Sequence, residues 1–215
     1  MFTGIVEEIG RVSKISRGRH SAVLEIGAQK VLEHTKIGDS IAVNGICLTV
    51  TSLGAGSFTA DVMHETLDRS ALAALRSGDH VNLERAMPAD GRFGGHMVGG
   101  HIDGTGRIVS IEKDDTAVWF TVQVKPELLR YVVEKGSIAM DGISLTVAKT
   151  QGDRFSVSAI PHTVRETVLH WRRPGELVNL ETDMIGKYVE QLLHLSQKQD
   201  GRGGITEEFL TKYGF

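Results

Sequence analysis

The side chains best suited to chemistry in this chain of 215 residues are dispersed, and one segment gathers two of them. His96 and His101 lie in the glycine-rich segment GGHMVGGHID, which ends at Asp103. A metal site would need further ligands close by. Three interpretations therefore remain for these histidines: metal ligands, residues that cap turns, or residues that contact a ligand where glycines let it approach the backbone.

Cys47 is the only cysteine, and it lies in an apolar run where a lone cysteine usually belongs to the core. The run SIAVNGICLTV at 40–50 recurs as SIAMDGISLTV at 137–147, with 8 of 11 positions identical and Ser144 in place of Cys47. Small polar side chains in two otherwise apolar runs need hydrogen-bond partners. A ligand is one candidate partner, and a core position is the alternative.

Familiar enzyme motifs do not account for these residues. The sequence contains no P-loop, no GxSxG and no HExxH. The segment GTGRI at 104–108 lacks the third glycine and the following helix of a dinucleotide site. Any chemistry must come from residues that the fold brings together.

The recurrence extends beyond these eleven residues and predicts an internal duplication. The offset is 97 (137 − 40), and it persists to VNLE at 81–84, which recurs at 178–181. Near the front the offset becomes 96, where TGIVEEIGRV at 3–12 aligns with GGHIDGTGRI at 99–108. The copies differ at selected polar positions: Asn44 against Asp141, Cys47 against Ser144, and Ala86 against Asp183. Such differences predict two similar pockets with unequal chemical tasks.

Each copy reads as a small β domain. Short runs rich in Val, Ile and Thr, bounded by Gly, Asp and Asn, predict about six strands per copy, which is enough to close a small antiparallel barrel. Two segments, 65–78 and 126–134, predict short helices. We expect an all-β chain with one domain at 1–90, a second at 97–183, and a different C-terminal segment at 184–215.

The C-terminal segment predicts an amphipathic helix over 184–199. Apolar residues recur at helical spacing on one face: Ile185, Tyr188, Val189, Leu192 and Leu193. This face would either pack on its own chain or associate with other copies. We favour self-association, because both barrels look complete without the helix.

Composition excludes several classes of function. The net charge is −3 and no basic run is present, which argues against nucleic acid as a partner. No apolar stretch approaches the ~18–20 residues of a membrane span, so no membrane association is expected. The start, MFTGIVEEIG, lacks the layout of a signal peptide, and a single cysteine forms no intrachain disulfide. We expect a cytoplasmic protein.

Several motifs in one order carry a family resemblance. MFTGIVEEIG, NGICLTV, HETL, GGHMVGGHID and DGISLTV together resemble the α-chain type of riboflavin synthase, from Met1 to about Asp183 and again in the terminal helix. The resemblance implies two homologous six-stranded Greek-key barrels and a helix through which three chains form a homotrimer. It also implies a site between the N-barrel of one chain and the C-barrel of its neighbour.

The resemblance implies a reaction as well. Members convert two molecules of 6,7-dimethyl-8-ribityllumazine, held together in one site, into riboflavin and 5-amino-6-(D-ribitylamino)uracil by transfer of a four-carbon unit, the last step of riboflavin biosynthesis. No cofactor and no metal are implied, and association with lumazine synthase is a possible further partnership. Holding two heterocycles in one orientation removes much of the entropic barrier, and a few polar groups move protons.

Residues are carried over by position. The resemblance implies a catalytic set of Ser144, Asp183, Cys47, His101, Ser40 and Phe2. Ser144 and Asp183 would assist addition at lumazine C7, Cys47 and Ser40 would contact the partner lumazine, and His101 would shuttle protons.

The implied substrate contacts form two groups. On the N-barrel side we expect Gly4, Ile5, Val6, Cys47, Leu48, Thr49, Asp61, Val62, Met63, His64, Glu65 and Thr66. On the C-barrel side we expect Gly100, His101, Ile102, Lys135, Ser144, Leu145, Thr146, Ile160, Pro161, His162, Thr163, Val164 and Arg165.

Two residues depart from the family's pattern, and two other classes of protein are alternatives to the enzyme. Ile46 stands where some members have a second cysteine, and His162 stands where some carry Glu, so a cysteine-pair mechanism and the ribityl contacts are in doubt. The rival is a lumazine- or flavin-binding antenna protein of the same fold, which binds without turnover and is expected to lose the catalytic polar residues. A paired-barrel interaction module without a small-molecule ligand is a third hypothesis.

Overall fold

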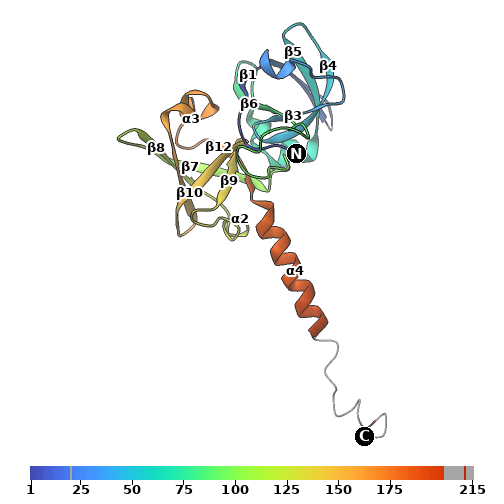
Figure 1. Cartoon of the computed structure of the whole chain (residues 1–215). Helices are drawn as coiled ribbons and strands as arrows, with labels where there is room; N and C mark the ends of the chain where they lie inside the picture. The colour runs from blue at the N-terminus through green and yellow to red at the C-terminus, as the bar shows by residue number, and fades with distance from the viewer. Residues whose placement is uncertain (20, 201–210, 212–215) are drawn as a thin grey trace. The chain divides into compact units, whose positions relative to one another are not determined.

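The structure is a computed structural model that describes residues 1–19, 21–200 and 211, with only the backbone described for 195–200. The described chain divides into two compact units, Met1–Asp183 and Met184–Phe215. The first unit contains two closed six-stranded barrels (Figure 1). The expected fold class, two antiparallel barrels and a C-terminal helix, is confirmed.

The first barrel closes in the strand order β1-β2-β5-β4-β3-β6. All its strand pairs are antiparallel, and β2 pairs with β5 instead of its sequence neighbour β3, which is the crossover of a Greek key. The strands are β1 Glu8–Arg17, β2 Ser21–Gly27, β3 Ser40–Val43, β4 Ile46–Leu53, β5 Ser57–Met63 and β6 His80–Arg85.

The second barrel closes in the order β10-β11-β8-β7-β12-β9, the same circuit read from another strand. Its β9–β10 hairpin pairs Ser144 with Ala139, as β3–β4 pairs Cys47 with Ala42. The strands are β7 Gly104–Asp114, β8 Ala117–Gln123, β9 Ser137–Met140, β10 Ile143–Gln151, β11 Arg154–Ala159 and β12 Leu177–Thr182.

Alternation of side chains builds each core. Along β2, Ala22, Leu24 and Ile26 are buried while the residues between them are exposed or half-buried, the period of two expected for a strand with one face inside. Phe58 and Phe155, which the offset of 97 aligns, are both 1% exposed inside their own barrels. The barrels therefore have separate apolar cores of similar composition.

The helices are shorter than the sequence suggests. The helix expected over 65–78 is divided into α1 His64–Arg69 and a 3₁₀ turn, η2 Ala71–Ala74, because the Ser70 hydroxyl bonds the Thr66 carbonyl and accepts from the Leu72 N–H. The helix expected over 126–134 is only α2 Pro126–Leu129, because Val132 and Val133 are poor helix formers. The other short helices are η1 Lys30–Leu32, α3 Pro161–Arg165 and η3 Val168–His170.

The two barrels contact each other about their β3–β4 and β9–β10 hairpins. Asn82 donates through Nδ2 to the Asp141 carbonyl at 2.9 Å, and Asn179 donates through Nδ2 to the Asn44 carbonyl at 2.9 Å. Gly45 and Gly142, with φ of +80° and +78°, meet so closely that a Cβ on either would lie 2.7 Å from the other's backbone nitrogen. The contact thus repeats the internal symmetry of the sequence.

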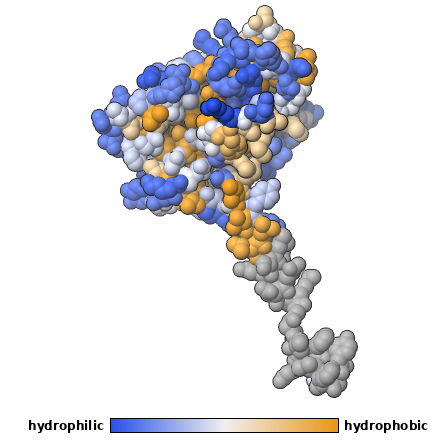
Figure 2. All heavy atoms as spheres, viewed as in Figure 1, coloured by the Kyte–Doolittle hydropathy of each residue, from blue (hydrophilic) through white to orange (hydrophobic). Residues whose placement is uncertain are grey.

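The helix expected over 184–199 is present as α4, Met184–Asp200. Its apolar face is exposed in the single chain, from 49% for Val189 to 68% for Tyr188, and Figure 2 shows hydrophobic side chains over its described part. Among the described residues, no helix is long and apolar enough to cross a membrane. The tail after 200 lies outside the described residues except at 211.

Candidate functional site

The expected contact segments form two groups. The segments that include 4–6 and 100–102, which we call the chain-crossing segments, each lie against the barrel of the other copy. The Ser144 N–H donates to the Gly4 carbonyl at 2.7 Å, and Val6 packs on the core of the second barrel. The Cys47 N–H donates to the Gly100 carbonyl at 2.9 Å, and Ile102 packs on the core of the first barrel. We expected 4–6 in the N-barrel group and 100–102 in the C-barrel group. This assignment was wrong, because each copy sends its first segment across to the other barrel.

Each group consists of residues that are expected to contact one ligand, and we name it as a pocket for that reason. The first group, which we call the Cys47 pocket, consists of 47–49, 61–66 and 100–102. Cys47 is half-buried, and His101, next to Gly100, is exposed. Met63, at the end of β5, is 68% exposed, whereas Leu48 and Val62 turn into the barrel core at 5% and 1% exposure. Only the backbone of these two core residues is available to a ligand.

The second group, which we call the Ser144 pocket, consists of 4–6, 144–146 and 160–165. Ile5 and Ile160 are 49% and 61% exposed, so apolar surface borders this pocket as well. His96 joins the group, because its Nδ1 lies 2.7 Å from the Ser144 hydroxyl.

The His96 ring is unusually placed for a polar group. It is 7% exposed, and its Nε2 has no hydrogen-bond partner among the described residues. Burial lowers the pKa of His96 below its ordinary 6.5, and the negative charge of Asp183 opposes that shift. A neutral His96 can accept the Ser144 proton, so Ser144, His96 and Asp183 form an arrangement suited to proton transfer.

Phe2, Ser40 and Lys135 lie outside this arrangement. Phe2 is fully buried and packs with Val98, Ala42 and Cys47, so its ring helps to hold the cysteine side chain in position. Lys135 is exposed at the turn before β9, where its N–H donates to the Val147 carbonyl at 2.8 Å.

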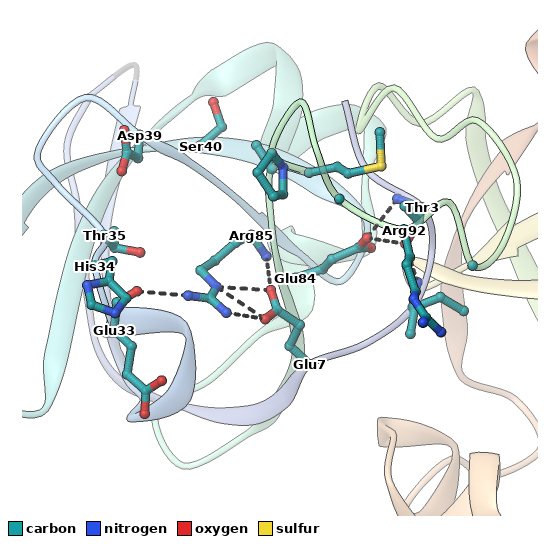
Figure 3. A pocket seen from close by; sticks show the side chains of 16 residues that line it. Thr3, Glu7, Glu33, His34, Thr35, Asp39, Ser40, Glu84, Arg85 and Arg92 are labelled. Carbon is teal, nitrogen blue, oxygen red and sulfur yellow. Dashed lines mark hydrogen bonds and ion pairs between the residues drawn. The ribbon is translucent and has the colours of Figure 1, made fainter.

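Ser40 borders a cavity of about 660 Å³ on the first barrel (Figure 3). Within it, Arg85 and Glu7 form an ion pair at 2.6 Å, and Glu84 accepts hydrogen bonds from Thr3. Burial alone would raise the pKa of Glu7, but the hydrogen bonds from Arg85 outweigh it and the pKa is lowered. The cavity wall is therefore built mostly from groups that already have partners.

The difference between Asn44 and Asp141 belongs to the barrel contact and not to a pocket. Asp141 is fully buried, and its Oδ2 accepts from Arg172 at 2.6 and 3.0 Å. The residue equivalent to Arg172 in the first copy is Leu75 (172 − 97). The charged pair in one barrel is thus replaced by an Asn and a Leu in the other, which corrects the expectation that this difference reflects unequal chemistry.

His96 is the site residue that the expected catalytic set lacked. The signal was present in GGHMVGGHID, where a ligand-contacting role was one of three interpretations. Among the described residues, no group of three His, Cys, Asp or Glu side chains is arranged to hold a metal ion.

Two family-model matches coincide with the two barrels: residues 3–86 and 99–183 each match the lumazine binding domain. The fold is shared with LumP in complex with riboflavin, with a TM-score of 0.78, 25% identity, and coverage of 85% of this chain and 99% of that one. The chain is therefore a duplicated lumazine-binding-domain protein.

Full-length relatives define the family more narrowly. The chain is 51% identical over 215 residues to the riboflavin synthase of Actinobacillus pleuropneumoniae, with 100% of both chains covered. It is 47% identical over 215 residues to that of Bacillus subtilis, again with 100% of both covered. The chain belongs to the riboflavin synthase family, as its motifs suggested.

Proposed function

We propose that this chain converts two molecules of 6,7-dimethyl-8-ribityllumazine into riboflavin and 5-amino-6-(D-ribitylamino)uracil. One observation carries the proposal: equivalent strands of the two copies carry Cys47 and Ser144, and His96 Nδ1 lies 2.7 Å from the Ser144 hydroxyl. Two copies of one substrate suit two homologous pockets, and donor and acceptor roles suit pockets that differ in their proton-transfer groups.

In this mechanism an O–H nucleophile that adds at lumazine C7 gives its proton to the Ser144 hydroxyl, and Ser144 passes its own proton to His96, which burial holds neutral. Asp183 offsets the positive charge that then develops on the imidazole. Cys47 and His101 contact the second lumazine in the other pocket. The acidic C7 methyl of the lumazine lowers the demand on these groups, so orientation of the two rings supplies much of the rate.

We further propose that chains associate through α4 into a trimer. The exposed face of Ile185, Tyr188, Val189, Leu192 and Leu193 supports association, since a contiguous apolar stripe at helical spacing gains stability when covered. In the trimer a Cys47 pocket and a Ser144 pocket from different chains would complete one site. A cytoplasmic location fits a chain with a single cysteine.

The test is turnover of the purified lumazine, compared between the unmodified chain and Ser144→Ala. We expect riboflavin from the unmodified chain and a kcat reduced roughly 10²–10⁴-fold in Ser144→Ala, the usual range for loss of a proton-transfer group. Ser13→Ala, at an exposed position of β1, is the matched control and should keep full activity. Stable binding of lumazine without riboflavin would favour the antenna-protein alternative and refute the proposal.

A further inference from the structure

Two buried carboxylates at equivalent positions bind backbone outside their own strands. Glu84 in β6 and Glu181 in β12 are related by the offset of 97, and they are 6% and 4% exposed. Buried carboxylates are costly unless hydrogen bonds replace their hydration. The partners of these two are therefore informative.

Glu84 holds the first chain-crossing segment. Its Oε1 accepts from the Thr3 N–H and the Thr3 hydroxyl, each at 2.7 Å (Figure 3). Its Oε2 accepts from the Gly4 N–H at 3.0 Å. Burial raises the pKa of Glu84, and these hydrogen bonds counteract that shift. The carboxylate thus fixes two consecutive peptide groups.

Glu181 holds the second chain-crossing segment in the same way. Its Oε1 accepts from the Gly99 N–H at 2.6 Å, and its Oε2 accepts from the Gly100 N–H at 3.0 Å. Both Gly4 and Gly100 have positive φ, +75° and +80°, which lets consecutive N–H groups converge on one anion.

The opposite sides of these segments contact the pockets of the other barrel. Beyond Glu84, the Gly4 carbonyl accepts from the Ser144 N–H at 2.7 Å, and the Thr3 carbonyl accepts from the His96 N–H at 3.1 Å. The His96 N–H therefore binds a peptide group that Glu84 fixes, and the Ser144 N–H binds the next peptide group along the same segment.

Beyond Glu181, the Gly100 carbonyl accepts from the Cys47 N–H at 2.9 Å, and His101 is the next residue of the chain. Gly100 and Cys47 are in close contact, because a Cβ on Gly100 would lie 2.6 Å from the Cys47 Cβ. A shift of the segment by a few tenths of an ångström would move the cysteine.

We propose that Glu84 and Glu181 are positioning residues that act crosswise, with Glu84 of the first barrel ordering the Ser144 pocket and Glu181 of the second barrel ordering the Cys47 pocket. The assignment of these pockets to the two lumazines rests on the proposed function. The crossed dependence itself rests on the hydrogen bonds alone, so it can be tested without substrate.

The test uses Cys47, the only thiol, as a local reporter. Iodoacetamide alkylation of the full-length chain is followed by mass spectrometry for Glu84→Gln, Glu181→Gln and the unmodified chain, without ligand. We expect Glu181→Gln to raise the alkylation rate about fivefold or more, because one charge-assisted acceptor is lost. Glu84→Gln reaches Cys47 only indirectly, through Phe2, which follows the Thr3 N–H that Glu84 binds, so it should have the smaller effect and stay within about twofold of the unmodified chain.

Activity measurements test the other dependence, that of the Ser144 pocket on Glu84. Glu84→Gln should lower kcat roughly 10- to 100-fold and move the acid limb of its pH profile, because the Ser144–His96 geometry changes. Glu181→Gln should leave that limb in place. A merely structural role in each carboxylate's own barrel predicts the reverse for Cys47, with Glu84→Gln raising its alkylation rate and Glu181→Gln inert.

Two controls keep the outcomes separate. Glu112→Gln, exposed on β7, should change neither readout. If Glu84→Gln does not fold, Thr3→Val removes one donor to the same carboxylate and should lower kcat without changing Cys47 alkylation. Equal alkylation in all variants would overturn the inference, whereas a chain that makes no riboflavin but shows the crossed alkylation would refute only the proposed function.

Discussion

The buried pair of Asp141 and Arg172 offers the sharpest test of how the duplication diverged, because the first copy provides its own uncharged replacement. Asp141 is 0% exposed and receives Arg172 Nε and Nη2 at 3.0 and 2.6 Å, together with the Asn179 N–H at 2.9 Å. The perturbation is Arg172→Leu, which copies Leu75 and leaves the aspartate without its cation.

The expected magnitude follows from the desolvation of Asp141. Removing one partner of a fully buried ion pair costs about 3–5 kcal/mol. The matched double variant, Asp141→Asn with Arg172→Leu, restores the combination of Asn44 and Leu75, and it should lie within about 1 kcal/mol of the unmodified chain. The double variant should then be about 2–4 kcal/mol more stable than Arg172→Leu alone.

Urea unfolding followed by circular dichroism measures these free energies of unfolding. In thermal unfolding, Arg172→Leu should lower the melting temperature by roughly 2–4 °C for each kcal/mol of stability lost. Its cost should also depend on pH. Burial raises the pKa of Asp141, and loss of Arg172 raises that pKa further, so the folded state binds more protons than the unfolded state. Stability must then fall as pH rises above the ordinary aspartate value of 3.8, and the deficit should shrink in acid.

Two results would refute this reasoning. One is an Arg172→Leu variant that loses less than about 1 kcal/mol, since an isolated buried carboxylate could not be so well tolerated. The other is a double variant no more stable than the single one.

Three further predictions concern the pocket, the helix and the barrel contact. Asp183→Asn removes the charge that raises the pKa of His96, so the acid limb of kcat should move to lower pH, while an unmoved limb would exclude this histidine as the base. Leu192→Glu, which places a charge on the exposed apolar face, should dissociate the assembly in sedimentation velocity and abolish turnover; retained assembly would exclude this face. Gly45→Ala should lower stability by more than Gly152→Ala in thermal unfolding, because both have positive φ but only Gly45 lacks space for a Cβ; equal losses, about 1–2 kcal/mol each, would contradict the tight contact.

The fold was predictable because the signals were redundant. The repeat at an offset of 97 and the alternating apolar runs both indicate two β barrels, and the stripe from Ile185 to Leu193 indicates α4. Competition of side-chain hydroxyls for backbone hydrogen bonds was harder to predict. The hydroxyl of Ser70 ends α1 by bonding the preceding turn, an effect that propensities do not contain.

The crossing of the chain could not be read from the repeat. Aligning Gly4 with Gly100 leaves both assignments equally consistent with the sequence, because exchanging two equivalent segments changes no residue match. Only the contacts of Val6 and Ile102 with the opposite cores decide it. The sequence shows only that the second copy has both Asp141 and Arg172 where the first has Asn44 and Leu75, and the structure shows that the two form a pair.

The most direct measurement of the central claim is the stoichiometry of turnover by the purified full-length chain. Incubated with 6,7-dimethyl-8-ribityllumazine alone, in the presence of a chelator and without added cofactor, the chain should consume two lumazines for each riboflavin formed. The ribitylaminopyrimidine should appear in an amount equal to riboflavin. Lumazine that binds stoichiometrically but stays unconverted would contradict the account.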